Sequence, residues 1–297
     1  MSVQSTVTQD VGSARTTFER GDVVLRAEGL SKRFVTKRNF IGRPVDHVHA
    51  VDDVSIELRH GETLALVGES GSGKSSTARL LVQLEVPDAG RVEVFGEDWV
   101  SLSRSELRSR RRRMQMVFQD PFASLNPMKM VVYAVGEPLM VHDGLRGAAL
   151  DRKVLSLLDQ VGLPSSALHR YPYEFSGGQR QRIAIARALA ADPEIVIADE
   201  AVSALDVSTQ AQILNLLRDI QHDRGLSFLF ITHDLGVVRQ VADRISVMFR
   251  GKVVEEGTAD EVFTHPREAY TRRLLSAVPE VSPTARERRR TTLESDA

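Results

Sequence analysis

The stretch GESGSGKSS, residues 68–76, constrains the fold of this chain more than any other part of its sequence. It fits the pattern G-x-x-x-x-G-K-[ST], a glycine-rich loop followed at once by a lysine and a hydroxyl residue. The apolar run before it, Thr63–Val67, is typical of a short buried strand. The segment after it has the apolar spacing of a helix, with Leu80, Leu81 and Leu84 on one face. A strand, a glycine loop and a helix in this order predict a loop that binds phosphate.

Each residue type in the loop suits the binding of a nucleoside triphosphate. Glycines let successive backbone N–H groups turn toward an anion, and the start of the helix adds about half a positive charge at the same place. Lys74 supplies a cation for the β- and γ-phosphates, and the Ser75 hydroxyl is a natural ligand of Mg²⁺. The candidate nucleotide-binding residues here are Gly68, Glu69, Ser70, Gly71, Ser72, Gly73, Lys74, Ser75 and Ser76.

The composition is that of an ordinary globular chain, and it excludes several kinds of site. The chain has 297 residues and a net charge of −1, so no global basic excess argues for nucleic acid. It has no cysteine, which excludes disulfides, thiolate metal sites and iron–sulfur clusters. No apolar run is long enough to span a membrane. Residues 1–22 lack the apolar segment of a secretory signal and are expected to form a disordered tail, and residues 281–297 form a second polar tail.

The segments around the loop predict a fold of alternating strands and helices. Residues 23–30 and 50–58 alternate like strands on either side of a loop over 35–49, and predict a small antiparallel sheet. Further strands are expected at 91–95, 114–118, 195–199, 226–232 and 244–249, and helices at 101–113, 207–224 and 235–242. We therefore expect an α/β chain of the P-loop NTPase (RecA-like) class, with a parallel-sheet core and an N-terminal antiparallel β subdomain.

The segment from about 120 to 186 differs in character and predicts an inserted α-helical subdomain. Its clearest signal is an amphipathic helix whose apolar residues recur at helical spacing, namely Leu150, Val154, Leu157, Leu158 and Val161. The nucleotide-binding domain as a whole is expected to cover residues 23–280.

Polar side chains follow three of the expected strands, at the edge where ligands bind in open α/β sheets. Gln119 could contact the metal ion or the water near a γ-phosphate, and Asp199 could hold Mg²⁺ through water. Glu200 could take a proton from attacking water, and His233 could hydrogen-bond the γ-phosphate. Each residue alone has a structural reading, since an acidic pair after a strand often caps a helix. Their order together with the phosphate loop favours catalysis, with Glu200, His233 and Gln119 as catalytic residues.

The sequence holds a second glycine turn, SGGQ, whose role the phosphate loop does not explain. Ser176, Gly177, Gly178 and Gln179 stand at the start of an expected helix, which makes them a second candidate anion site. A single nucleotide has no evident way to contact both loops of one chain. We expect a dimer in which this loop of one chain closes on the γ-phosphate held by the other.

Two further features have competing interpretations. Phe34 is either a core aromatic at a strand end or a ring that stacks on adenine, which offers a π-face. The four arginines 110–113 suggest nucleic acid, but a short basic run without interleaved aromatic residues is usually a solvated helix face.

These motifs together resemble those of an ABC transporter ATPase subunit over residues 24–280. The matching parts are Walker A (68–75), the Q-loop residue Gln119, the signature FSGGQ (175–179), Walker B (195–200), the D-loop SALD (203–206) and the H-loop residue His233. More narrowly, the stretches FQDPFASLNP (118–127) and ADEAVSALDVS (198–208), and a C-terminal segment over about 258–280 that includes HPREAYTRRLLSAVP, resemble the second ATPase subunit of oligopeptide/dipeptide importers.

The resemblance implies a cofactor, partners and a location. Two chains would bind two ATP–Mg²⁺ head to tail, as a heterodimer with a second ABC ATPase subunit or as a homodimer. Two membrane permease subunits and an extracytoplasmic substrate-binding protein would complete an importer, with this chain at the cytoplasmic face of the cell membrane and no nucleic acid involved. Relatives of this type are also associated with nickel, glutathione and oligosaccharides.

Two other classes compete with a transport ATPase. A soluble ABC ATPase acting on nucleic acid often carries long coiled-coil arms, but Lys74 and Ser176 stand only 102 positions apart. A P-loop kinase would leave SGGQ and His233 without a role.

Overall fold

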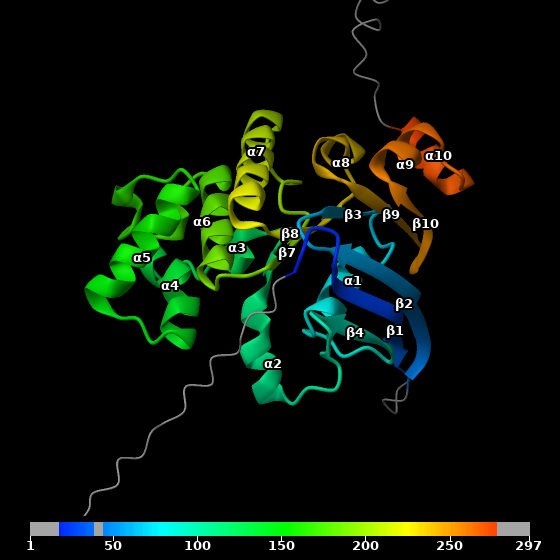
Figure 1. Ribbon diagram of the computed structural model, residues 1–297, viewed down its shortest axis with the longest axis horizontal. Coiled ribbons are helices and arrows are strands. Elements are labelled where there is room, and N and C mark those ends of the chain that lie inside the picture. Colours follow the sequence, from blue (N-terminus) through cyan, green and yellow to red (C-terminus); the bar gives the residue numbers. More distant parts are fainter. Residues whose placement is uncertain (1–17, 39–43, 278–297) are drawn as a thin grey trace, which may run out of the picture.

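The computed structural model describes residues 18–38 and 44–277, which form two β-sheets with helices around them (Figure 1). The larger sheet has six strands in the order β10-β9-β3-β8-β7-β6. These strands are β3 (Thr63–Val67), β6 (Met114–Val117), β7 (Ile195–Asp199), β8 (Ser227–Thr232), β9 (Arg244–Phe249) and β10 (Lys252–Thr258). The pairs β3–β8, β3–β9, β6–β7 and β7–β8 are parallel. The expected parallel α/β core is confirmed.

Strand β10 was not predicted, and it makes one edge of this sheet antiparallel. It returns along β9 after a two-residue turn, in which Arg250 and Gly251 have φ angles of 47° and 85°. Two consecutive positive φ angles are the shape of a tight hairpin turn. The sheet is therefore mixed, with five parallel strands and an antiparallel edge.

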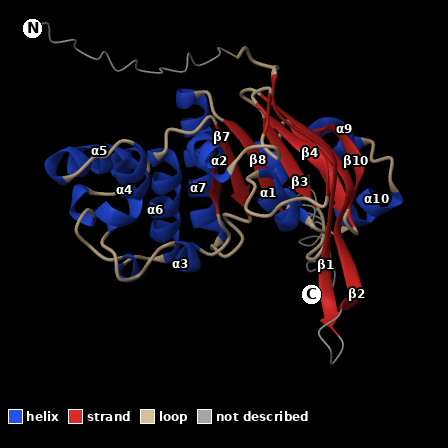
Figure 2. Ribbon diagram, turned by 90° about the horizontal axis from the view of Figure 1, so that it is seen from below, coloured by secondary structure: helices blue, strands red, loops and turns tan. Residues whose placement is uncertain are grey.

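The smaller sheet is antiparallel, in the order β2-β1-β4-β5. Its strands are β1 (Val23–Arg38), β2 (Pro44–Arg59), β4 (Ala89–Val94) and β5 (Glu97–Asp98). The loop expected over 35–49 is wrong for the described residues, because β1 and β2 continue to pair out to Arg38 and Pro44. Figure 2 shows this hairpin projecting beyond the rest of the fold. Val35 and Val48, two apolar residues of this extension, are 39% and 52% exposed, so their positions do not give the buried apolar alternation by which a strand is predicted.

Ten α-helices in the described residues surround the sheets. They are α1 (Lys74–Leu81), α2 (Arg104–Arg110), α3 (Pro121–Ser124), α4 (Val131–His142), α5 (Gly147–Gln160), α6 (Gly177–Ala190), α7 (Val207–Arg224), α8 (Leu235–Val241), α9 (Ala259–Thr264) and α10 (Ala269–Ser276). Helix α1 ends before Leu84, which is 52% exposed and not on its buried face as expected. The apolar stripe predicted for α5 is buried, with Val154 and Leu158 fully enclosed. Among the described residues, no helix is both long and apolar enough to cross a bilayer.

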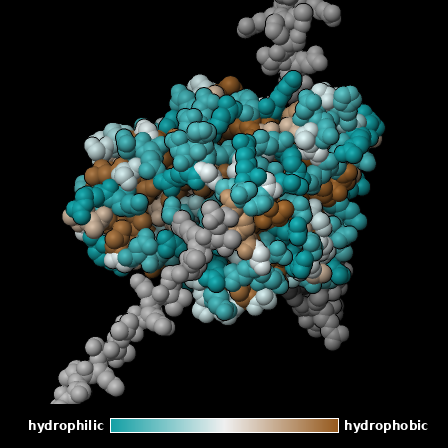
Figure 3. Space-filling view, in the orientation of Figure 1, coloured by the Kyte–Doolittle hydropathy of each residue, from teal (hydrophilic) through white to brown (hydrophobic). Residues whose placement is uncertain are grey.

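The central strands β3, β7 and β8 of the larger sheet are buried on both faces, which explains their continuous apolar runs. Leu64 and Leu66 of β3 pack in one core with α1 and the smaller sheet. Ala65 and Val67 point the other way and pack with α8, α9 and α10. A third core lies between β7, β8 and the helices α4 to α7. The outer surface in the view of Figure 3 is mostly hydrophilic, with hydrophobic residues in small separate patches.

The prediction of a disordered tail over residues 1–22 is wrong for residues 18–22. Residues 1–17, like 281–297, lie outside the described residues, but residues 18–22 belong to the fold. The Phe18 ring packs on Phe95 with centroids 5.2 Å apart, and the Gly21 N–H donates to the carbonyl of His60. These are long-range contacts, which a polar local sequence does not reveal.

The four arginines 110–113 are anchors of the fold and not the solvated helix face that we favoured. Arg110 pairs with Glu97, Arg111 donates to the backbone carbonyls of Val82 and Gln83, and Arg112 pairs with Asp143. Burial lowers the pKa of Arg111. Each guanidinium reaches a different element, so the run joins α2 to its neighbours.

Arg113 makes the most extensive of these contacts. Two of its nitrogens donate to the Glu194 carboxylate, at 2.6 Å and 3.1 Å, and its guanidinium lies 3.7 Å from the centroid of the Phe95 ring. A two-point contact to a carboxylate combined with stacking on an aromatic ring is the arrangement that arginine supplies and lysine cannot. It links Phe95, the residue after β4, to Glu194, the residue before β7, and these strands belong to different sheets.

Arg113→Ala is therefore expected to lower the free energy of unfolding by about 1–3 kcal/mol, because it removes the two-point contact to Glu194 and a cation–π contact. Urea denaturation measures this. The control is Arg104→Ala on the exposed face of α2, expected to stay within about 0.5 kcal/mol of the wild type. Equal effects of the two substitutions would show that Arg113 is not an anchor.

Candidate functional site

The phosphate loop leaves the carboxyl end of β3 and is held by close backbone approaches. A Cβ atom at Gly68 would lie 2.2 Å from the carbonyl oxygen of Met248, and one at Gly73 would lie 2.1 Å from that of Ala50. Gly73 also has a φ of +109°, which side chains rarely adopt. Gly68 and Gly73 are thus required by neighbours from other segments of the chain.

Inside the loop, Lys74 and Ser72 have buried polar groups. The Lys74 ammonium donates to the carbonyls of Gly68 at 2.7 Å and Glu69 at 2.9 Å. Burial lowers its pKa, while the nearby Glu200 and Asp199 oppose that shift. The Ser72 hydroxyl is buried and has no hydrogen-bond partner within the described chain. A desolvated cation and an unsatisfied hydroxyl at a helix start suit a bound anion.

The two candidate metal ligands from distant parts of the chain lie together. The Ser75 hydroxyl donates to the Asp199 carboxylate at 3.0 Å. Burial raises the pKa of Asp199, and the hydrogen bond from Ser75 works against that shift. The register of the sheet explains why Ser75 and Asp199 lie together, since β7 and β3 both pair with β8 in parallel.

The three candidate catalytic residues also converge. The Gln119 amide donates to one oxygen of the Glu200 carboxylate at 2.8 Å, and His233 Nδ1 lies 3.3 Å from the other. Glu200 has a φ of +47°, an uncommon backbone state for a residue other than glycine. Such strain often persists where a side chain must be aimed. The carboxylate is thus held between two polar groups, one residue beyond Asp199.

The SGGQ turn begins α6, where its polar side chains cap the helix. Ser176 Oγ accepts from the Gln179 N–H at 3.3 Å, and Gln179 Oε1 accepts from the Ser176 N–H at 3.0 Å. No hydrogen bond joins residues 176–179 to residues 68–76 in the part of the chain that the structure describes. Apart from Phe34, the sequence-predicted residues therefore form one converged site and one separate loop.

Phe34 lies on the projecting hairpin and is 36% exposed. This exposure rules out the core interpretation. Stacking on adenine stays a prediction, and Lys32 Nζ, 5.9 Å from the ring centroid, is its charged neighbour.

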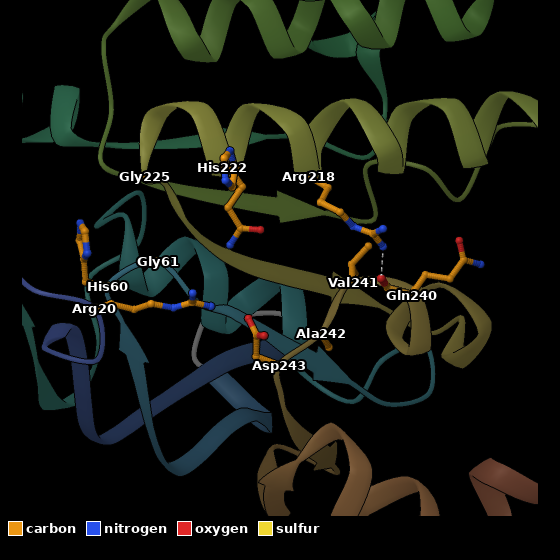
Figure 4. A pocket seen from close by; sticks show the side chains of 11 residues that line it. Arg20, His60, Gly61, Arg218, His222, Gly225, Gln240, Val241, Ala242 and Asp243 are labelled. Carbon is orange, nitrogen blue, oxygen red and sulfur yellow. Dashed lines mark hydrogen bonds between the residues drawn. The ribbon is translucent and has the colours of Figure 1, made fainter.

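A pocket of about 480 Å³ opens at the amino ends of the central strands of the larger sheet, opposite the phosphate loop (Figure 4). It is lined by residues that precede β3, β8 and β9, namely Gly61, Gly225 and Asp243, together with basic side chains such as Arg20 and Arg218. None of the sequence-predicted site residues lines it. In parallel sheets ligands bind at the carboxyl ends of strands, so we place the functional site at the phosphate loop and not in this pocket.

Comparison with known families agrees with this geometry. Residues 51–203 match the family described as ABC transporter. The chain belongs to the ABC transporter family. Residues 254–296 match a second description, the oligopeptide/dipeptide transporter C-terminal region.

Individual relatives are similar over most of this chain. It is 47% identical to the dipeptide transport ATP-binding protein DppF of Haemophilus influenzae, over 90% of this chain and 81% of that protein. It is also 47% identical to the glutathione import ATP-binding protein GsiA of Salmonella paratyphi A. That match covers 94% of this chain but only 45% of the relative, so the chain spans about half the length of that protein.

Solved structures confirm the fold. A dimeric post-hydrolysis state of the ATP-binding cassette MJ0796, bound to ADP and Pi, matches with a TM-score of 0.69 and 29% identity, over 79% of this chain and 98% of that one. CbiO1 from Clostridium perfringens matches with a TM-score of 0.69 and 27% identity, over 82% of this chain and 92% of that one.

Sequence reasoning missed two residues beside the site. Tyr270 reaches the phosphate loop from the C-terminal segment, and Thr209 packs on the SGGQ turn, where a Cβ at Gly178 would lie 2.3 Å from its methyl carbon. The segment HPREAYT was identified only through the family resemblance. Neither contact has a local sequence signal, because both depend on how distant elements pack.

Gly178→Ala is expected to lower the free energy of unfolding by about 1–3 kcal/mol, because the new methyl group overpacks against Thr209. Thermal or urea unfolding of the monomer measures this. In a Thr209→Ser background the methyl carbon is gone, and the penalty is expected to disappear.

The matched control is Gly177→Ala, whose Cβ would lie 3.7 Å from the nearest Leu205 atom, an ordinary contact. It is expected to leave stability unchanged or slightly raised, since alanine favours a helix. A penalty at Gly178 that persists with Thr209→Ser would contradict the overpacking.

Proposed function

We propose that this chain is the ATP-binding and ATP-hydrolysing subunit of an importer that takes up oligopeptides or dipeptides across the cytoplasmic membrane. ATP hydrolysis is supported above all by one observation. The Glu200 carboxylate is held between Gln119 and His233, beside the Asp199–Ser75 pair. The C-terminal family match over 254–296 and the similarity to a dipeptide transport protein support the peptide cargo.

In this proposal the hydrolytic roles divide among three residues. Glu200 takes the proton from the water that attacks the γ-phosphorus, a role worth about 10²–10⁴ in rate. Gln119, already bonded to that carboxylate, orients the water. His233 donates to an oxygen of the γ-phosphate, and Lys74 neutralises charge on the β- and γ-phosphates. All four side chains meet at the carboxyl edge of the larger sheet.

Mg²⁺ is proposed to accompany ATP at Ser75 and Asp199, with Gln119 nearby. The residues fit the ion, because a hydroxyl and a carboxylate 3.0 Å apart offer the oxygen ligands that Mg²⁺ prefers. Within the described ranges no group of three or more His, Cys, Asp or Glu is placed to hold a metal alone. Phosphate oxygens and water would therefore complete its shell. Bound there, the ion would supply charge neutralisation for the phosphates.

The second half of the site is proposed to come from another chain. The SGGQ turn makes no hydrogen bond to the phosphate loop of its own described chain, and α6 starts there with its positive end. Closure of two chains head to tail would bring Ser176, Gly177, Gly178 and Gln179 of one protomer to the γ-phosphate of the other. The partner is proposed to be a second ABC ATPase subunit, with a homodimer as the alternative. The similar MJ0796 cassette is described as dimeric.

The transport partners follow from the same proposal. Two membrane permease subunits and an extracytoplasmic substrate-binding protein would complete the importer, with this chain at the cytoplasmic face of the membrane. Nucleic acid is not a favoured partner, because arginines 110–113 are engaged within the fold. Glutathione is the second candidate cargo, favoured by the 47% identity to GsiA.

Glu200→Gln is expected to reduce ATP hydrolysis by about 10²–10⁴-fold while ATP affinity stays near that of the wild type, because the amide keeps the shape but cannot take a proton. Phosphate release and equilibrium nucleotide binding measure the two effects. Glu137→Gln, an exposed carboxylate on α4, is the control and should hydrolyse normally. Wild-type turnover by the Glu200 variant would refute its role as general base.

The cargo can be tested in liposomes that contain the membrane proteins co-purified with this chain and their binding protein. A dipeptide is expected to raise ATP hydrolysis several-fold, and glutathione to leave it at the basal rate. The reverse pattern would assign glutathione as the cargo. A Lys74→Ala preparation in the same liposomes shows the background without this chain's activity.

A further inference from the structure

The C-terminal helix α10 contacts the phosphate loop through one hydrogen bond. The backbone N–H of Glu69 donates to the hydroxyl of Tyr270 at 3.1 Å. Glu69 is the second residue of the loop, and its carbonyl accepts from the Lys74 ammonium. Both backbone polar groups of Glu69 are therefore occupied, the carbonyl by the loop and the N–H by a residue 201 positions away.

Packing fixes where the Tyr270 hydroxyl lies. The side chain is buried, with 6% exposed, and its ring packs on Phe249 with centroids 4.1 Å apart. Phe249 is the last residue of β9, next to the strand that leads into the loop. The hydroxyl thus sits on a rigid support, and a small movement of the ring would break the bond to Glu69.

A buried carboxylate fixes the start of α10. Glu255 of β10 accepts from the backbone N–H groups of Arg267 at 2.7 Å and Glu268 at 3.0 Å. Its side chain is 2% exposed, and the Arg267 guanidinium lies 3.8 Å away. The residues just before the helix are therefore tied to the sheet, so Tyr270, two positions beyond Glu268, has little freedom. The segment PREAYT, residues 266–271, is built around these contacts.

We propose that Tyr270 is a positioning residue that holds the phosphate loop in its binding shape, so that the C-terminal region sets nucleotide affinity. The inference rests on the proposed binding of ATP by this loop. A loop whose N–H groups already point inward binds phosphate without first being ordered. Tyr270 accepts from the N–H of Glu69, and the Ser72 N–H donates to the Glu69 carbonyl at 3.2 Å. In this proposal the other amides of residues 70–76 bind phosphate.

Tyr270→Phe keeps the ring and removes only the hydroxyl. The dissociation constant for ATP–Mg²⁺ and the KM for ATP are expected to rise about 3- to 10-fold, the value of one hydrogen bond. The kcat is expected to stay within about twofold, because the groups at Glu200 are untouched. Tyr133→Phe, on an exposed tyrosine of α4, is the matched control and should change neither constant.

Glu255→Gln provides a second variant, because it weakens the tie at the start of α10 without changing its size. It is expected to raise the ATP dissociation constant in the same direction. The double variant should show less than the product of the two effects, since both act through one contact. Multiplicative effects would overturn the link from Glu255 to Tyr270.

Three results separate this inference from the function on which it rests. Unchanged ATP affinity in Tyr270→Phe, with binding lost in Lys74→Ala, overturns the positioning role and leaves the ATPase standing. A fall in kcat with unchanged KM also overturns it. Failure of the wild-type protein to bind ATP–Mg²⁺ overturns both.

Discussion

Parallel pairing of β3, β8 and β7 is the constraint on which the site depends. Val67 pairs with Thr232, and Asp199 pairs with Ile231, so the three strands end within a residue or two of one another. Whatever follows each strand must then lie at the same edge of the sheet. The phosphate loop, the acidic pair and His233 are brought together by this register, although more than 150 residues separate the first from the last.

Burial at this edge leaves opposite charges close together and poorly solvated. Desolvation lowers the pKa of Lys74 and raises that of Asp199, so each group loses part of its preference for the charged form. Their mutual attraction offsets some of that cost. A ligand that carries both negative phosphates and a divalent cation complements the two groups at once, which a simple anion or cation alone would not do.

The sequence predicted the features that arise from local spacing. An apolar run followed by a polar residue marks both a buried strand and the group at its end, so Gln119, Glu200 and His233 could be found before their contacts were seen. The projecting hairpin, strand β10 and the anchoring of arginines 110–113 could not be predicted in this way. Each depends on pairing with a distant partner, and no local periodicity encodes which partner is used.

The phosphate loop takes its shape from the far end of the chain as well as from its own glycines. Met248 lies against Gly68, and the Gly251 N–H donates to the carbonyl of Ser72 at 2.9 Å. During synthesis on the ribosome, the loop emerges long before the β9–β10 hairpin that completes its walls. A nascent chain would therefore carry the motif for some time without a finished binding site, and capture of the nucleotide would come late in its maturation.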